Sequence, residues 1–240
     1  MDVLCSDKTG TLTTGTMILD RCLDPLGQPN ERPLRLAALN SVYETGIRSP
    51  LDTAILAAGQ PDTQAYAKVD EIPFDFERRR LSIVVEGPYG RVLITKGAPE
   101  SILQSATAYE VAETSTPLDA AARTRCQAVY QHLSAQGYRV LGVASRPMPA
   151  QPGYTAADER DLVLAGFLAF LDPPMTGVRD ALQALRRDGV TVKILTGDNE
   201  LVTQHVCTQV GLEARQMCLG DEVERLSDTA LAVVAERTTV

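Results

Sequence analysis

Residues 5–13, Cys-Ser-Asp-Lys-Thr-Gly-Thr-Leu-Thr, constrain the fold of this chain more than any other stretch, because they place a carboxylate directly after a predicted buried strand. The apolar run 3–5 is typical of a short parallel strand, Asp7 follows it closely, and Gly10 has the backbone freedom that a sharp turn needs. At the carboxyl edge of a parallel sheet, an aspartate can attack phosphorus as a covalent nucleophile. The segment therefore predicts a catalytic strand end.

The residues around Asp7 are more specific than an ordinary turn. An aspartate that begins an Asx-turn is the plainer interpretation, but such a turn does not require Lys8, Thr9 and Thr11 as well. Residues 7–13 resemble the phosphorylation motif of the P-type ATPases, within the haloacid-dehalogenase-like superfamily. The resemblance implies that Asp7 accepts the γ-phosphate of ATP, that Asp7 and the Thr9 carbonyl help to hold Mg²⁺, and that Thr11 steadies the phosphate. Related phosphatases carry a second aspartate at the position of Thr9, so its absence implies a persistent aspartyl-phosphate.

Length and composition are those of a soluble globular chain. The 240 residues are 44% hydrophobic and 22% charged, enough for one or two ordinary cores. The sequence has no apolar run of roughly 18 residues and no signal-peptide pattern, so we expect no membrane span within it. A net charge of −8 without a basic cluster argues against nucleic acid as a partner. Five cysteines without C-x-x-C spacing and two histidines favour neither zinc nor a disulfide framework.

The middle of the chain combines helical and antiparallel patterns. Ser-Pro at 49–50 is a helix start signal, and the Gly-Pro-Tyr-Gly at 87–90 separates two strand-like runs as a hairpin turn does. In order, the sequence predicts a linker at 15–33, helices at 34–43 and 50–58, hairpin strands at 81–86 and 91–95, a helix at 116–136, a strand at 138–145 and a strand pair or bend at 162–171.

The region around this hairpin has the side chains that a nucleotide needs. An aromatic ring can stack on adenine, and nearby lysine or arginine can meet phosphates; Phe76, the arginines at 78–80 and Lys96 offer these groups. Taken by themselves, however, an isolated Phe is more often core, and an arginine triplet is more often a solvated surface.

Resemblance to the same family favours the functional interpretation. Phe76 resembles the adenine-stacking Phe of the family's nucleotide-binding domain, and Lys96 with Gly97 begins a Lys-Gly-Ala run like the one found there. The same likeness implies further polar contacts to ATP from Asp52, Arg78 and Arg139. The placement of Asp52 in the first turn of a predicted helix is equally well explained by the helix dipole. The chain departs from many calcium and sodium pumps at Leu81, where those proteins have a lysine.

The last third of the chain alternates strand and helix, which is typical of doubly wound α/β folds. Asp-Pro-Pro at 172–174 precedes it and suits a hinge between domains, as in the family. A helix at 176–188, a strand at 190–195 and a helix at 200–210 follow. The end of that strand is followed by Thr196, Gly197 and Asp198, just as Asp7 stands at the end of the first strand. We expect them to form the second half of one catalytic site, in which the Thr196 hydroxyl and the Gly197 amide hold phosphoryl oxygens. The resemblance implies that Asp198 helps to position nucleotide and metal.

These patterns predict an α/β and α+β chain with two interleaved domains. Residues 1–15 and 173–240 would form a partial doubly wound, haloacid-dehalogenase-like parallel sheet, the phosphorylation domain. Residues 16–172 would form an inserted nucleotide-binding domain, an antiparallel sheet flanked by helices. The family's later lysine and its Gly-Asp-Gly-x-Asn-Asp motif do not occur in the sequence. We therefore expect a cytosolic fragment, incomplete at its C-terminus, that binds ATP without turning it over.

The segments 68–86 and 157–162 resemble the bacterial magnesium-transporting P-type ATPases. This likeness implies a fragment of a cation pump that lies at the cytoplasmic face of the cell membrane. Its cofactors would be ATP and Mg²⁺. Its partners would be the membrane and actuator domains of the same pump, and the transported cation would bind outside this chain. A calcium- or proton-type pump, a soluble phosphatase of the superfamily, and a nucleotide-binding module without chemistry are the alternatives.

Overall fold

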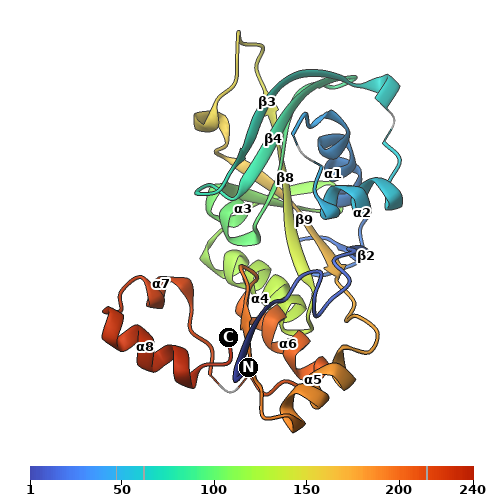
Figure 1. Cartoon of the computed structure of the whole chain (residues 1–240). Coiled ribbons are helices and arrows are strands. Elements are labelled where there is room, and N and C mark those ends of the chain that lie inside the picture. The colour runs from blue at the N-terminus through green and yellow to red at the C-terminus, as the bar shows by residue number, and fades with distance from the viewer. Residues whose placement is uncertain (47, 62, 215) are drawn as a thin grey trace. The chain divides into compact units, whose positions relative to one another are not determined.

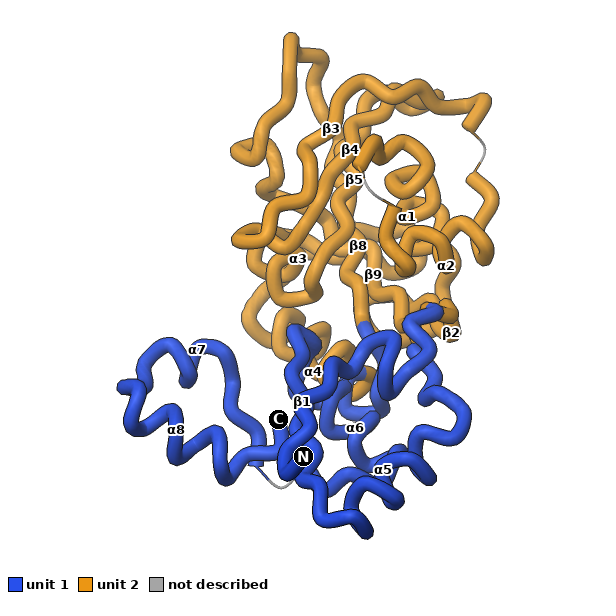
Figure 2. Tube along the Cα trace, viewed as in Figure 1, with its two compact units in different colours: residues 1–16, 134–139, 172–240 blue, residues 17–133, 140–171 orange. Residues whose placement is uncertain are grey.

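Two compact units make up the chain in a computed structural model, which describes residues 1–46, 48–61, 63–214 and 216–240 (Figure 2). Unit 1 comprises Met1–Thr16, Ser134–Arg139 and Asp172–Val240, and unit 2 comprises Met17–Leu133 and Val140–Leu171. The chain thus enters unit 2 from unit 1 and returns, with one short excursion at 134–139.

The helices and strands of both units are shown in Figure 1. The strands that fall mainly in unit 2 are β2 (Ile18–Leu23), β3 (Ala67–Asp75), β4 (Arg80–Gly87), β5 (Gly90–Gly97), β6 (Ala106–Val111), β7 (Thr114–Pro117), β8 (Arg139–Met148) and β9 (Leu162–Leu171). Its helices are α1 (Arg32–Tyr43), α2 (Pro50–Ala58), α3 (Pro99–Ser105) and most of α4 (Ala120–Ala135), with short 3₁₀ helices η1 (Thr63–Ala65) and η2 (Ala156–Asp158). Unit 1 contains β1 (Val3–Asp7), β10 (Thr191–Leu195), α5 (Val178–Arg187), α6 (Glu200–Val210), α7 (Gly220–Val223) and α8 (Asp228–Arg237).

An eight-stranded sheet organises unit 2 in the order β3-β4-β5-β8-β9-β6-β7, with β2 also paired to β9. The predicted hairpin is confirmed as β4 and β5, which turn between Gly87 and Gly90. The sheet is not wholly antiparallel, because β6 runs parallel to β9. The predicted strand pair or bend at 162–171 is the single strand β9.

The predicted linker at 15–33 is wrong over part of its length. Residues Ile18–Leu23 form β2, which pairs antiparallel with β9 from Ile18 opposite Leu171 onward. Asp20 and Arg21 are exposed in this strand, so it lacks the apolar alternation by which a strand is usually recognised. The neighbouring Gly and Pro residues reinforced the appearance of a loop.

Helices cover both faces of the sheet of unit 2. On β4, Ile83 and Val85 pack in a cluster with Leu39 of α1, whereas Val84 points to the opposite face, in a cluster with Ile102 of α3. Successive residues of a strand point to opposite faces, so the continuous burial of β4 reflects cover on both sides. Helix α2 joins the α1 side, and α4 joins the α3 side.

Two helix starts test the capping signals of the sequence. Helix α2 begins as predicted, because Ser49 and Asp52 form a reciprocal capping box. The helix predicted from residue 116 begins only at Ala120, because Thr114–Pro117 forms β7 and the Asp119 side chain accepts the Ala122 amide at 2.7 Å. No helix in the described part of the chain is both long and apolar enough to cross a bilayer.

Unit 1 is built around a two-stranded parallel sheet of β1 and β10. Its core contains Leu12, Leu182, Ile194 and Cys207, which come from the loop after β1, α5, β10 and α6. The chain as a whole is therefore a mixed α/β structure with parallel and antiparallel pairing, as expected. The predicted strand and helices at 176–210 are present as α5, β10 and α6, each within two residues of its expected start.

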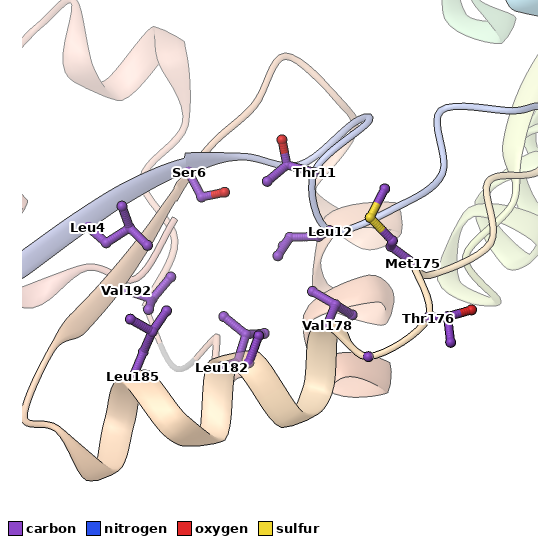
Figure 3. A pocket seen from close by; sticks show the side chains of 12 residues that line it. Leu4, Ser6, Thr11, Leu12, Met175, Thr176, Val178, Leu182, Leu185 and Val192 are labelled. Atoms are coloured by element: carbon purple, nitrogen blue, oxygen red, sulfur yellow. The ribbon is translucent and has the colours of Figure 1, made fainter.

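A cavity of about 340 Å³ lies between this small sheet and α5 (Figure 3). Leu182 and Leu185 of α5 point toward Leu4 of β1 and Val192 of β10 across it. None of its lining residues is charged. Most of the lining is aliphatic, so the cavity is mainly a gap in the apolar packing between the sheet and α5.

Candidate functional site

Asp7 is the last residue of β1 and lies opposite Leu195, the last residue of β10. Parallel strands end at the same edge of a sheet. Asp7, which ends β1, and Thr196, which directly follows β10, therefore lie at the same edge of this sheet. Asp7 is exposed, and one of its carboxylate oxygens, Oδ1, accepts the Lys8 amide at 2.8 Å. The structure thus brings together the two strand ends that the sequence singled out.

Lys8 is buried, with only 1% of its surface exposed. Its Nζ lies 2.6 Å from Asp198 Oδ2 and 3.8 Å from Asp172 Oδ2. The Thr9 hydroxyl donates to the same Asp198 oxygen at 3.5 Å, and the Asp198 amide donates to the Thr196 hydroxyl oxygen at 3.2 Å. Lys8 therefore links the loop after β1 to the loop after β10 and does not extend into solvent. Gly197, between Thr196 and Asp198, is exposed.

Hydrogen bonds to the Lys8 carbonyl and to Asp172 also hold the loop after Asp7. The Lys8 carbonyl accepts the amides of Thr11, Leu12 and Thr13 at 3.4, 2.9 and 3.2 Å, while Thr11 itself stays exposed. Asp172 accepts the Thr13 hydroxyl at 2.6 Å and the Gly15 amide at 2.9 Å. The sequence indicated Asp172 only as part of a hinge, and its position before two prolines gave no sign of these contacts.

The described residues contain no group of three or more His, Cys, Asp or Glu side chains that could hold a metal ion. Asp198 is engaged by Lys8, which leaves Asp7 as the exposed carboxylate of this edge. Mg²⁺ commonly binds one or two protein carboxylates and keeps waters or substrate phosphates as its other ligands. Asp7 fits that kind of partial site.

Phe76 lies in the turn between β3 and β4, in unit 2, and 88% of its surface is exposed. Its ring packs edge-to-face against Phe74, with centroids 5.3 Å apart. The interpretation of Phe76 as a core residue is therefore wrong. An exposed aromatic ring that a neighbouring ring supports is available for stacking on a planar ligand.

Lys96, near the end of β5, is buried among polar partners. Its Nζ lies 2.8 Å from Glu44 Oε2, donates to Ser41 Oγ at 2.9 Å, and pairs with Asp52. The cluster therefore contains one ammonium and two carboxylates. The sequence identified Lys96 and Asp52 but missed Glu44 and Ser41, which come from the end of α1 and carry no motif.

Asp52 is the best-anchored carboxylate of this cluster. It accepts the hydroxyls of Ser41 at 2.7 Å and Ser49 at 2.5 Å, as well as the Lys96 ammonium. Burial alone would raise the pKa of Asp52, but the charge of Lys96 and the hydrogen bonds from Lys96, Ser49 and Ser41 outweigh burial and lower the pKa. Asp52 does lie in the first turn of α2, where it forms a capping box with Ser49, and the contact with Lys96 adds to this local role.

Arg78 and Gly97 lie where β4 and β5 meet the turn that carries Phe76. Arg78 pairs with Glu159 through Nη1 and donates from Nη2 to the Pro73 carbonyl at 2.8 Å. A Cβ at Gly97 would come within 2.5 Å of the Arg79 carbonyl oxygen, so this position requires glycine. The contact found for Arg139 is in unit 1, where its Nη1 lies 3.5 Å from Asp198 Oδ1.

Comparison with known proteins identifies the family. The family model described as "P-type ATPase, cytoplasmic domain N" matches residues 24–177. The chain is 47% identical to "Magnesium-transporting ATPase, P-type 1" of Salmonella typhimurium, over the whole chain and 27% of that protein. It is 45% identical to the protein of the same name from Escherichia coli strain K12, over the whole chain and 28% of that protein.

More distant relatives include "Probable proton ATPase 1A" of Leishmania donovani, 30% identical over 95% of this chain and 22% of that protein. The chain belongs to the P-type ATPase family, and most of unit 2 falls within its cytoplasmic domain N. It spans about a quarter of the length of the curated relatives, 27–28% for the magnesium-transporting ones.

Proposed function

We propose that this chain is the ATP-binding and phosphorylation part of a P-type ATPase that transports a cation through an aspartyl-phosphate on Asp7. The observation that carries the proposal is the exposed Asp7 carboxylate at the end of β1, in a loop whose lysine is buried and already paired. The names of the relatives that are 45–47% identical support magnesium as the transported ion. Such a pump would carry this chain on the cytoplasmic side of its membrane, beside membrane and actuator domains.

In the proposed reaction, a carboxylate oxygen of Asp7 attacks the γ-phosphorus of ATP. The new Asp–phosphorus bond forms as the bond to the β-γ bridging oxygen breaks, and ADP leaves with that electron pair. Thr11 and Thr196 can donate hydroxyl protons to phosphoryl oxygens, and the exposed Gly197 amide can do the same. Asp7 and the Thr9 carbonyl would hold Mg²⁺, which supplies neutralisation of phosphoryl charge when bound.

The buried Lys8–Asp198 pair has a positioning role in this proposal. With the ammonium and a carboxylate neutralising each other, Asp7 keeps its charge exposed at the edge of the sheet. The pair also fixes the distance between the two loops that would surround the phosphoryl group. This arrangement supports a haloacid-dehalogenase-like phosphorylation domain made of residues 1–15 and 173–240, which remains a prediction.

Phe76 is the proposed platform for adenine in unit 2. Asp52, Arg78, Lys96 and Arg139 remain predictions as polar contacts to ATP, and each has a partner within the protein. Lys96 would have to exchange a carboxylate for a phosphate oxygen to reach the nucleotide. We therefore propose that Phe76 contributes more to ATP affinity in this chain than any of these four side chains.

The test of the proposed function is covalent labelling of the longer pump with ATP radiolabelled at the γ-phosphate. The wild type should form an acid-stable, hydroxylamine-sensitive phosphoprotein, and Asp7→Asn should abolish it because the amide is no nucleophile. Asp2→Asn, an exposed aspartate just before β1, is the matched control and should leave labelling intact. Labelling of Asp7→Asn at the wild-type level would overturn the assignment. Steady hydrolysis of an aryl phosphate by this chain, dependent on Asp7, would indicate a phosphatase.

A further inference from the structure

We propose that Glu159 is a positioning residue for nucleotide binding, which holds the turn at residues 76–79 so that Phe76 is ordered before the ligand arrives. The proposal rests on the proposed ATP-binding function of unit 2. No motif in the sequence assigns Glu159 a role. Glu159 directly follows η2, about eighty positions after the turn in the chain.

Glu159 lies at the centre of a buried polar network. Its side chain is fully buried, and its Oε2 accepts hydrogen bonds from Arg78 Nη1 and from Arg80 Nε, the latter at 2.8 Å. Its Oε1 accepts the Ser82 hydroxyl at 2.7 Å. One carboxylate therefore joins the 76–79 turn to the first residues of β4. These partners hold the Glu159 carboxylate strongly, because any movement of the carboxylate would break hydrogen bonds to buried or charged groups.

The 76–79 turn has little apolar packing to fix it. Phe76 is 88% exposed, and a polar cavity of about 500 Å³ lies between the turn and α3, lined by residues 77–80, 100, 101, 104 and 105. Arg79 has φ of +52°, a left-handed conformation that residues other than glycine adopt at some energetic cost. Polar contacts must therefore hold the turn in this shape.

Most of those polar contacts are local or reach the neighbouring α3 region. Asp75 Oδ1 accepts the amides of Glu77 and Arg78 at 3.1 and 2.8 Å, and the Ser101 hydroxyl donates to the Arg78 carbonyl at 2.5 Å. The Arg79 carbonyl accepts the Ala98 amide at 2.9 Å. Glu159 adds a buried negative charge, which pairs with the guanidinium groups of Arg78 and Arg80.

Loss of the Glu159 charge should make the turn more mobile in the free protein. Arg78 and Arg80 would then lack their shared carboxylate, and nucleotide binding would have to order the turn at the expense of affinity. We expect Glu159→Gln to weaken binding of adenosine, ADP and ATP by a similar factor, about threefold to tenfold, as for ordering one or two side chains. The factor should not depend on phosphate number, because the platform contacts the base.

Titration calorimetry with adenosine, ADP and ATP tests this expectation on the whole chain. Glu100→Gln is the matched control, since Glu100 is an exposed carboxylate that lines the same cavity. It should leave all three affinities unchanged. Circular dichroism and thermal unfolding show whether each variant is folded. If Glu159→Gln does not fold, Arg78→Gln removes one arm of the network from a side chain that is 22% exposed and takes its place.

A double-mutant cycle separates positioning from general stability. In a Phe76→Ala background, Glu159→Gln should cause no further loss of adenosine affinity, because no platform remains to be ordered. Equal losses in both backgrounds would overturn the proposal, as would a loss that grows from adenosine to ATP, which would assign the arginines to phosphate. If the wild type binds the ligands and Glu159→Gln binds them with the same affinity, only the proposed role of Glu159 is contradicted. Failure of the wild type to bind any of the three ligands contradicts the proposed function itself.

Discussion

Lys8 in unit 1 and Lys96 in unit 2 are two buried lysines in the same electrostatic situation. Each was predicted from sequence as part of a phosphate-handling site, and each lies between two carboxylates, Asp198 and Asp172 for Lys8 and Asp52 and Glu44 for Lys96. A buried ammonium is tolerated only where opposite charges and hydrogen bonds compensate its desolvation. In both units the lysine therefore serves the protein's own structure before it can serve a ligand.

The two clusters differ in how the chain assembles them. The carboxylates around Lys96 come from the end of α1 and the first turn of α2, and Asp52 is already fixed by Ser49 in a capping box. Those around Lys8 come from segments far along the chain, in the loop after β9 and the loop after β10. The Lys96 cluster is thus prepared by local structure, whereas the Lys8 cluster exists only when unit 1 is fully folded.

Removing the Lys96 ammonium should give the largest effect on stability. We expect Lys96→Met to lower the free energy of unfolding by about 3–5 kcal/mol, because it leaves two carboxylates buried without their counter-charge. Urea unfolding measures the difference. Lys68→Met is the control, since the Lys68–Glu71 pair is partly exposed and should contribute at most about 1 kcal/mol. Equal losses in the two variants would mean that the Lys96 cluster is no more structural than a surface pair.

The same change at Lys8 sharpens the comparison. Lys8→Met should lower protection from hydrogen exchange in β1 and β10 and leave β4 and β5 unchanged, because its partners all lie in unit 1. Lys96→Met should have the reverse effect. Loss of protection across both units in either variant would show that the two clusters are not independent.

The exposed aromatic ring of unit 2 should affect binding without affecting stability. We expect Phe76→Ala to weaken ATP binding by about 1–3 kcal/mol, by analogy with base stacking on aromatic side chains. The melting temperature should not change, because the ring is 88% exposed. Tyr89→Ala is the control, at the tip of the β4-β5 hairpin, where the ring is 97% exposed. ATP affinity that is equal in Phe76→Ala and Tyr89→Ala would place the base elsewhere.

Local signals made part of this structure predictable. Ser49 before a proline predicted the start of α2, and the glycines at 87 and 90 predicted the β4-β5 hairpin, because a cap and a tight turn depend on neighbouring residues. The end of β1 at Asp7 could be predicted for the same reason. The mixed fold class followed from the change of pattern after residue 172.

Contacts between distant segments could not be predicted in this way. Glu44 and Glu159 are ordinary acidic residues in the sequence, and only the folded chain brings them to Lys96 and to Arg78. β2 was missed because its formation depends on pairing with β9. Three of its own six residues are exposed, so they give little local signal of a strand. Tertiary pairing overrides weak local preference in such cases.

The helix cap that holds Asp52 should have a smaller effect on stability than Lys96. We expect Ser49→Ala to lower the free energy of unfolding by about 1 kcal/mol, as is usual for loss of an N-cap. Thr53→Ala is the control, an exposed residue of the same helix whose hydroxyl donates to the Ser49 carbonyl at 3.3 Å. A loss as large as that of Lys96→Met would show that Ser49, and not the ammonium, is what fixes Asp52.

The smallest effect we expect is a pH dependence that Asp52 gives to unit 2. Because the pKa of Asp52 is lowered on folding, its stabilising contribution is fully present above the unfolded value, about 3.9, and is lost as pH falls through the lower folded value. Asp52→Asn cannot titrate, so its unfolding free energy should fall less steeply between neutral pH and the acid range than that of the wild type. Asp2→Asn removes the same charge from an exposed position and should keep the wild-type slope. Parallel profiles for wild type and Asp52→Asn would mean that protonating Asp52 does not weaken the cluster, and that Glu44 alone balances Lys96.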